Sequence, residues 1–125
     1  MTKLLLNKGS LGCILVLLLV FGCSKEPVNL ETFLVEKNGV YYTLDTTKPY
    51  SGPVFSNYKN INKKLSEGYL RDGKKDGKWI YSYQNGQIKI EGNYKDGELD
   101  GKVTYYHEWG LIDRVEEYEN GELVK

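Results

Sequence analysis

Aromatic and other side chains alternate in short runs along the second half of the chain. From Trp79 to Tyr83 every second residue is aromatic, which is the period-two pattern of a strand. Aromatic and β-branched residues suit such a half-buried, pleated surface. Asn85-Gly86 follows and favours a two-residue type I′ turn, because that turn needs positive φ at both central residues. The segment from Gln87 to Tyr94 is then predicted to return as the second strand of a β-hairpin.

The same pattern predicts further hairpins on either side. Asp96 to Gly101 is expected to form a wider turn, after which Lys102 to His107 begins the next hairpin. Asn38-Gly39 lies between two apolar runs near the start and predicts one more hairpin there. No helix is expected beyond the N-terminal apolar run, because glycine is frequent and no stretch keeps a period of 3.6 residues.

The hairpins repeat in sequence. Residues 67–88 can be laid over residues 91–112 at a shift of 24 positions, and four glycines then coincide: Gly68, Gly73, Gly77 and Gly86 fall on Gly92, Gly97, Gly101 and Gly110. A partial copy follows, and a degenerate earlier copy around Ser51-Gly52 needs one residue of adjustment, with Ile61 where glycine is expected. Each hairpin buries little alone and needs neighbours. The predicted fold is therefore all-β, an elongated antiparallel meander of β-hairpin repeats.

The N-terminus carries the features of a secretory signal peptide. Lys3 and Lys8 precede an uninterrupted apolar run from Leu11 to Phe21. The alternative is a transmembrane helix, which is less favoured because a span needs about 20 apolar residues. Val20-Phe21-Gly22-Cys23 resembles a lipobox, in which a small residue precedes an obligatory cysteine. That resemblance implies cleavage between Gly22 and Cys23, and acylation of the Cys23 thiol.

This interpretation predicts three segments: a cleaved signal peptide over residues 1–22, an acylated N-terminus and tether over 23–30, and the repeat domain over 31–125. Two or more acyl chains anchor a protein stably, whereas one gives marginal binding. Cys13 lies in the discarded signal, so no thiol remains in the mature domain. Ser24 follows the cysteine, which in enteric-type sorting favours the outer membrane. We therefore expect a lipid-anchored protein of the bacterial cell envelope, facing the periplasm or the cell surface.

Charge and composition argue against several functional classes. The chain has 17 basic and 17 acidic residues, and removal of residues 1–22 leaves 15 and 17, a formal net charge of −2. A domain with this charge balance has no excess of basic residues with which to bind nucleic acid. The recurring Asp-Gly pairs are expected to make turns rather than to bind calcium. His107 is the only histidine and no nucleophile accompanies it, so we expect neither catalysis, nor a metal, nor a cofactor.

Two segments resemble the bacterial variant of the MORN repeat. They are residues 94–106 and 70–83, which share an aromatic or apolar residue, two glycines four positions apart, and further aromatic residues beyond them. The segment Pro49-Tyr50-Ser51-Gly52 is similar to the opening of repeats in the bacterial YwqK-type antitoxin family. The resemblance covers roughly residues 38–123. It implies a twisted sheet of consecutive hairpins that serves interaction rather than catalysis, since such arrays are discussed as scaffolds for proteins and sometimes as lipid binders.

The large aromatic residues have two possible roles. They could form a surface that binds a partner, because tyrosine and tryptophan are enriched in binding hot spots, or they could be the core of a small sheet. We favour a core role for Trp79, Tyr81, Tyr83 and Tyr105, and expect Tyr106 and Trp109 to be exposed. The candidate partner-binding residues are Trp79, Tyr81, Tyr83, Tyr105, Tyr106 and Trp109.

The functional expectation combines the anchor with the repeats. The sequence favours a membrane-anchored lipoprotein that acts as a non-catalytic protein-binding or scaffolding module, attached to the membrane through acylated Cys23. The alternative is an antitoxin or immunity-type protein that neutralises a toxin by stoichiometric binding. The sequence does not identify the protein partner.

Overall fold

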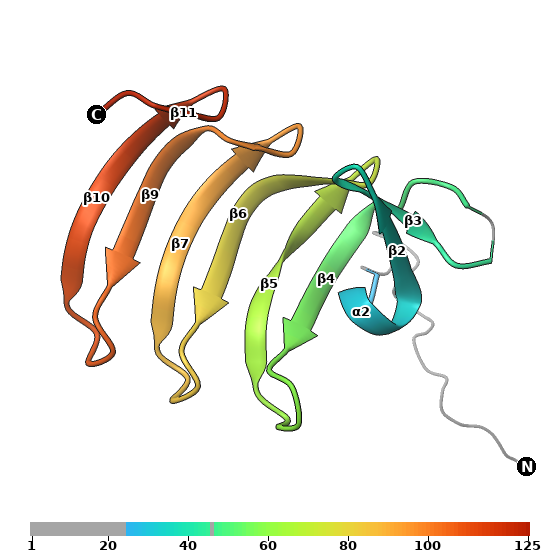
Figure 1. Cartoon of the computed structure of the whole chain (residues 1–125), viewed down its shortest axis with the longest axis horizontal. Helices are drawn as coiled ribbons and strands as arrows, with labels where there is room; N and C mark the ends of the chain where they lie inside the picture. Colours follow the sequence, from blue (N-terminus) through green and yellow to red (C-terminus); the bar gives the residue numbers. More distant parts are fainter. Residues whose placement is uncertain (1–24, 46) are drawn as a thin grey trace, which may run out of the picture.

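The computed structural model describes residues 25–45 and 47–125, and most of these residues form one curved sheet of hairpins placed side by side (Figure 1). The predicted all-β antiparallel meander is confirmed: the sheet order is β1-β4-β5-β6-β7-β9-β10-β11, with β8 paired to β7 and a separate β2–β3 hairpin. The elements are β1 (Val28–Asn29), α2 (Leu30–Phe33), β2 (Leu34–Lys37), β3 (Val40–Thr43), β4 (Gly52–Asn57), β5 (Lys64–Arg71), β6 (Lys74–Ser82), β7 (Ile88–Lys95), β8 (Glu98–Leu99), β9 (Gly101–Tyr106), β10 (Ile112–Glu119) and β11 (Glu122–Leu123).

Four tight turns along one edge of the structure share a single conformation. Asn38-Gly39, Asp72-Gly73, Asp96-Gly97 and Asn120-Gly121 have positive φ at both residues, 50° to 53° at the first and 81° to 86° at the glycine. These are the dihedral signs of a type I′ turn, which matches the twist of the flanking strands. The hairpin predicted at Asn38-Gly39 is confirmed. The expectation that the Asp-Gly pairs make turns is confirmed for Asp72-Gly73 and Asp96-Gly97 only. Asp76-Gly77 lies within β6 and Gly101 begins β9, where the two glycines have positive φ of 78° and 104°.

The turn types at Asn85-Gly86 and at Asp96-Gly97 are the reverse of those predicted. At Asn85-Gly86 only the glycine has positive φ, 92°. The Tyr83 N–H donates to the Gln87 carbonyl at 2.8 Å and the Gly86 N–H to the Tyr83 carbonyl at 3.0 Å, so this is a longer loop with a left-handed glycine. The predicted wide turn from Asp96 to Gly101 starts instead as a tight turn, after which β8 already pairs with β7. An Asx-Gly pair fits both turn types, so the strand pairing on either side decides between them.

The loop between β4 and β5 explains why the first copy of the repeat needs one residue of adjustment. The Tyr58 N–H donates to the Lys63 carbonyl at 2.9 Å, which makes this loop one residue longer than the loop closed by Tyr83 and Gln87. Asn60 supplies the positive φ, 65°, where the other hairpins use glycine. Asparagine tolerates this left-handed conformation better than most residues.

The expectation of no helix beyond the N-terminal apolar run is wrong, because α2 forms a single helical turn. Asn29 caps α2, since its side-chain Oδ1 accepts hydrogen bonds from the backbone N–H of Glu31 at 2.8 Å and of Thr32 at 3.3 Å. The turn brings Leu30 and Leu34, four positions apart, to the same side, where both are buried. A single turn is too short to give a helical period in the sequence.

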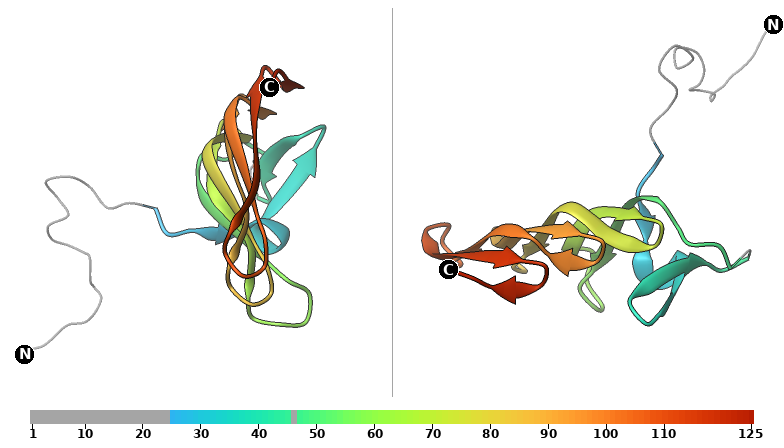
Figure 2. Two further views of the ribbon diagram at one scale, coloured as in Figure 1. Left: turned by 90° about the vertical axis from the view of Figure 1, so that its left-hand side faces the viewer. Right: turned by 90° about the horizontal axis from the view of Figure 1, so that it is seen from above.

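The end of the predicted tether belongs to the folded domain. Val28 pairs in parallel with Val54 of β4, and Leu30 is 8% exposed in the core. The covering layer formed by α2 and the β2–β3 hairpin lies against one face at the N-terminal end of the sheet, as the side view in Figure 2 shows. The rest of the sheet is a single layer.

The core alternates large side chains with glycine across neighbouring strands. Trp79 of β6 is 1% exposed and lies over Gly68 of β5, while Gly92 of β7 pairs with Trp79 on its other side. One repeat later, buried Val103 of β9 lies 3.6 Å from the position that a Cβ atom on Gly92 would occupy. Glycine at these two positions therefore provides the space into which a large residue on the next strand packs.

Candidate functional site

The structure distributes the six candidate aromatic residues between the core and two faces. Trp79 is in the core, where its indole Nε1–H donates to the Tyr69 carbonyl at 3.0 Å. Its buried ring is therefore unavailable to a partner. Tyr81, Tyr83, Tyr105 and Tyr106 are half-buried, and Trp109 is 68% exposed.

Tyr81 belongs to an aromatic cluster that surrounds one lysine. The Lys75 Nζ atom lies 4.8 Å from the Trp79 ring centroid, 5.5 Å from that of Tyr81 and 5.1 Å from that of Tyr94. It also donates a hydrogen bond to the Tyr81 hydroxyl at 2.8 Å. Burial and, less strongly, the hydrogen bond with Tyr81 raise the pKa of Tyr94 to about 12, against the opposing charge of Lys75. Both phenols therefore stay neutral, and the cluster ties β6 to β7 through cation–π contacts.

Tyr83 connects one hairpin to the next. Its hydroxyl donates to the Tyr106 carbonyl at 2.6 Å, and one hairpin earlier the Tyr58 hydroxyl donates to the Ser82 carbonyl at the same distance. The repetition of this bond indicates a structural role. One repeat later the same position holds His107, the only histidine.

Tyr105 and Tyr106 point to opposite faces of β9, as adjacent strand residues do. The Arg114 guanidinium lies 3.8 Å from the Tyr105 ring centroid and covers it. The Tyr106 hydroxyl donates to Glu91 at 3.2 Å, and that carboxylate also forms an ion pair with Lys78 at 3.0 Å. Both tyrosines are thus engaged within the sheet.

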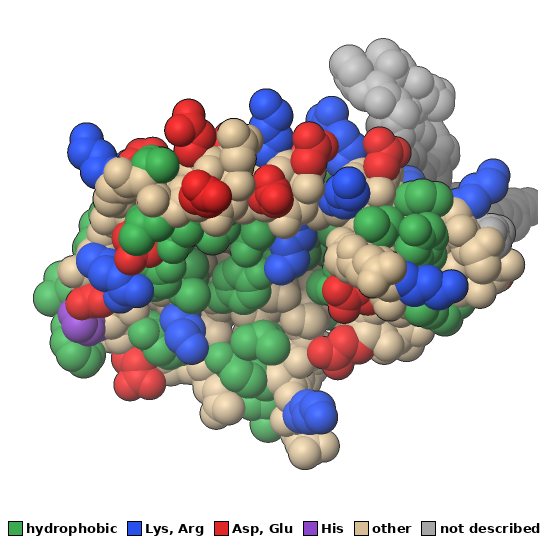
Figure 3. Space-filling view, turned by 45° about the horizontal axis from the view of Figure 1, so that its top comes forward, with side chains coloured by type: hydrophobic (Ala, Val, Ile, Leu, Met, Phe, Trp, Pro, Cys, Tyr) green, Lys and Arg blue, Asp and Glu red, His purple; other side chains and the backbone are tan. Residues whose placement is uncertain are grey.

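The tip of the β9–β10 hairpin carries an exposed apolar patch. We call Trp109, Leu111 and Ile112 the tip patch; they are 68%, 64% and 59% exposed. The Trp109 ring stacks on His107, with ring centroids 4.7 Å apart and planes 1° from parallel. Green hydrophobic side chains accordingly lie beside the single histidine at the left of Figure 3.

The preceding hairpin provides an internal comparison for this tip. Asn85 and Gln87 occupy there the positions of Trp109 and Leu111. The backbone is bonded alike in the two tips: the His107 N–H donates to the Leu111 carbonyl at 2.8 Å, as in the earlier loop, and the Gly110 N–H to the His107 carbonyl at 2.9 Å. Since polar residues satisfy the same turn, the fold does not require tryptophan and leucine at this tip.

Sequence reasoning identified Trp109 but missed Leu111, Ile112 and the aromatic contacts of Lys75. The signal for Leu111 was present, because an alignment of the two tips places it over Gln87, whereas Ile112 falls on Ile88 and gives no such contrast. The lysine could not be found in this way, because its position one repeat later holds Leu99 and the comparison of the two tips does not reach it.

Cys23 and Gly22, the predicted lipidation and cleavage residues, lie outside the described residues. No helix within residues 25–45 and 47–125 is long and apolar enough to cross a membrane. In that same part of the chain, no group of three His, Cys, Asp or Glu side chains is arranged to hold a metal ion.

Comparisons with protein-family models, curated proteins and solved structures find no match for this chain. The resemblance to MORN repeats therefore stays a prediction from the sequence.

Proposed function

We propose that this chain is an acylated lipoprotein of the bacterial envelope whose sheet is a non-catalytic protein-binding module, and that the tip patch makes the main contact. The observation that carries the proposal is the exposure of Trp109 and Leu111 at positions where the same loop elsewhere holds polar residues. Exposed apolar side chains that the fold does not need are a mark of an interaction surface.

The chemistry of the patch suits a protein partner. Tryptophan is the residue most enriched in binding hot spots, because a large rigid ring loses little conformational freedom when it is buried. Stacking on His107 already holds the Trp109 ring in one orientation. Asp113 and Arg114 form an ion pair at 3.0 Å beside the apolar residues, which provides a charged rim.

The position of the patch in the sheet fits an anchored module. Four residues, 24–27, separate Cys23 from β1, so an acylated Cys23 lies within about 18 Å of β1. β1 and β10 are near opposite ends of the strand order, and Figure 1 shows their two ends of the sheet far apart. The tip patch therefore lies near the end of the sheet opposite the proposed anchor, where a partner can approach.

The environment of His107 favours binding over catalysis. Its two described side-chain contacts are the stacked Trp109 ring and Asp113, whose Oδ1 lies 3.4 Å from the imidazole Nε2. This half-exposed contact with Asp113 orients the ring as part of the tip, and no hydroxyl or thiol of the described residues hydrogen-bonds to the imidazole as a nucleophile would.

Site-specific photo-cross-linking in living cells tests the proposal. A photoreactive phenylalanine analogue placed at Trp109 is expected to give a discrete cross-linked species, because the side chain would lie in the interface. The same analogue at Asn85, in the matching loop one repeat earlier, is the control and is expected to give little or none. Equal cross-linking at the two positions, or none at Trp109, would rule out the tip patch as the contact. Mass spectrometry of the captured chain distinguishes an envelope protein from a toxin, and so separates the scaffold from the antitoxin alternative.

A further inference from the structure

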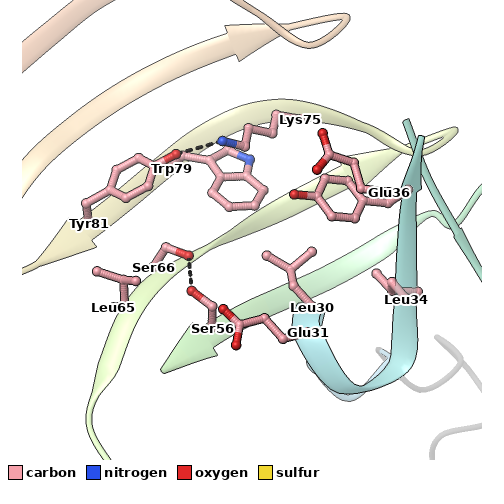
Figure 4. A pocket seen from close by; sticks show the side chains of 11 residues that line it. Leu30, Glu31, Leu34, Glu36, Ser56, Leu65, Ser66, Lys75, Trp79 and Tyr81 are labelled. Atoms are coloured by element: carbon pink, nitrogen blue, oxygen red, sulfur yellow. Dashed lines mark hydrogen bonds between the residues drawn. The ribbon is translucent and has the colours of Figure 1, made fainter. Parts of the chain in front are cut away.

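A pocket of about 580 Å³ lies at the other end of the sheet, between its covered face and the layer formed by α2 and the β2–β3 hairpin (Figure 4). Its size falls within the roughly 300–1,000 Å³ of small-molecule sites. Leu30, Leu34 and Leu65 supply apolar surface, while carboxylates, an ammonium group and hydroxyls supply polar groups.

Two buried hydroxyls in this pocket leave one donor without a partner. Ser56 of β4 and Ser66 of β5 are each 5% exposed, and their Oγ atoms are 2.7 Å apart. One hydroxyl donates to the other, so one O–H remains, and no acceptor for it is present among the described residues. Buried donors are almost always satisfied, so this O–H is positioned to donate to an acceptor from outside the chain.

The negative and the positive groups of the pocket lie on opposite walls. Glu31 of α2 and Glu36 of β2 lie on the hairpin side, and neither forms an ion pair with any described residue. Burial raises the pKa of the Tyr41 hydroxyl, and the charges of Glu36 and Glu31 raise it further, so both carboxylates act on one phenol of the lining. Lys75 lies on the sheet side, where its polar partner is the Tyr81 hydroxyl rather than a carboxylate.

We infer that this pocket binds a small zwitterion with an apolar side chain, a free amino acid or a short peptide. The ligand's ammonium group faces Glu31 and Glu36, and its carboxylate faces Lys75 and the unpaired serine hydroxyl. Its apolar side chain contacts the leucines. The pocket has two carboxylates, Glu31 and Glu36, and one ammonium group, that of Lys75, so its negative charge disfavours a purely anionic ligand. A zwitterion complements both walls at once. This site is distinct from the tip patch and does not depend on its role.

Isothermal titration of the full-length protein, extracted in detergent, tests the inference with three probes. They are leucyl-leucine, its N-acetyl form without the ammonium group, and its C-terminal amide without the carboxylate. Leucyl-leucine is expected to bind saturably and about tenfold or more tighter than either modified probe, because charge-assisted hydrogen bonds are among the strongest polar contacts. No saturable heat up to millimolar peptide, as expected if only water fills the pocket, or equal affinity for all three probes, would overturn it.

Variants of the two walls assign the charges. Glu31→Gln with Glu36→Gln keeps both exposed side chains nearly isosteric, so it should leave the fold intact. It is expected to weaken leucyl-leucine about tenfold and to leave the N-acetyl probe unchanged, because that probe has no ammonium group to lose. Lys75→Met should show the converse selectivity, weakening leucyl-leucine and sparing the amide probe. If the glutamine variant weakens the acetylated and free peptides alike, the proposed orientation is wrong.

Discussion

Gly68→Ala is expected to lower the free energy of unfolding by about 3 kcal/mol, the upper part of the range for overpacked cores. A Cβ atom at this position would overlap Cδ2, Cε2 and Cγ of Trp79, a buried ring that is 1% exposed and is held by its indole hydrogen bond to the Tyr69 carbonyl. The loss is a large fraction of the roughly 5–15 kcal/mol that stabilises an ordinary domain. Urea unfolding, followed by circular dichroism, measures it.

Gly92→Ala is the matched control, because Gly92 holds the same position one repeat later. Its added Cβ would lie 3.5 Å from Leu99 and 3.6 Å from Val103, which are ordinary van der Waals distances. Neither glycine has a φ in the left-handed region, so backbone strain does not distinguish them. We expect a cost below about 1 kcal/mol. Equal losses for the two variants would contradict the view that Trp79 is what requires glycine at 68. Trp79→Val should reduce the penalty of Gly68→Ala, since Val103 is tolerated against Gly92.

Cys23→Ser is expected to abolish metabolic labelling of the protein by an alkyne analogue of palmitate. The thiol is the proposed acylation site, and serine cannot form the thioether that carries the diacylglycerol. The loss matters energetically, because each methylene of an acyl chain contributes about 0.8 kcal/mol to membrane binding. In-gel detection of the alkyne in immunoprecipitated protein measures the incorporation.

Cys13→Ser provides the control for this labelling. That cysteine lies in the predicted signal peptide, so its replacement should leave the label and the processed N-terminus unchanged. The intact mass of the unsubstituted protein should correspond to residues 23–125 plus its acyl groups. Labelling that persists in Cys23→Ser, or a mature chain that still begins at Met1, would contradict the lipoprotein proposal.

The repeat architecture could be predicted because glycines recur at one fixed shift and strands alternate between them. The turn types could not, since Asn-Gly and Asp-Gly pairs accept either a tight turn or a longer loop and the pairing of the flanking strands decides. At Asn85-Gly86 the hydrogen bond from Tyr83 to Gln87 sets the longer loop. α2 was missed because it is a single turn capped by one asparagine.

The candidate sites were only partly predictable, for different reasons. The tip patch could be found by comparing two loops of the same chain, because Trp109 departs from Asn85 without a structural need. The pocket could not, because Glu36 and Lys75 lie far apart in sequence and meet only when the first hairpin packs on the sheet. The β2–β3 hairpin that closes the pocket lies outside the best-matched repeats, so the 24-residue repeat does not predict where this hairpin packs on the sheet.

The most direct test of the proposed function transplants one loop onto the other. Trp109→Asn with Leu111→Gln places at the tip the residues that the preceding hairpin uses, in a turn with the same backbone bonds. The measurement is the affinity of this variant for the chain captured by cross-linking at Trp109, compared with its urea unfolding midpoint. We predict an unchanged midpoint and an affinity at least about tenfold lower, as expected when a hot-spot tryptophan is removed. Unchanged affinity in a folded variant would contradict the claim that this exposed tip is the binding surface.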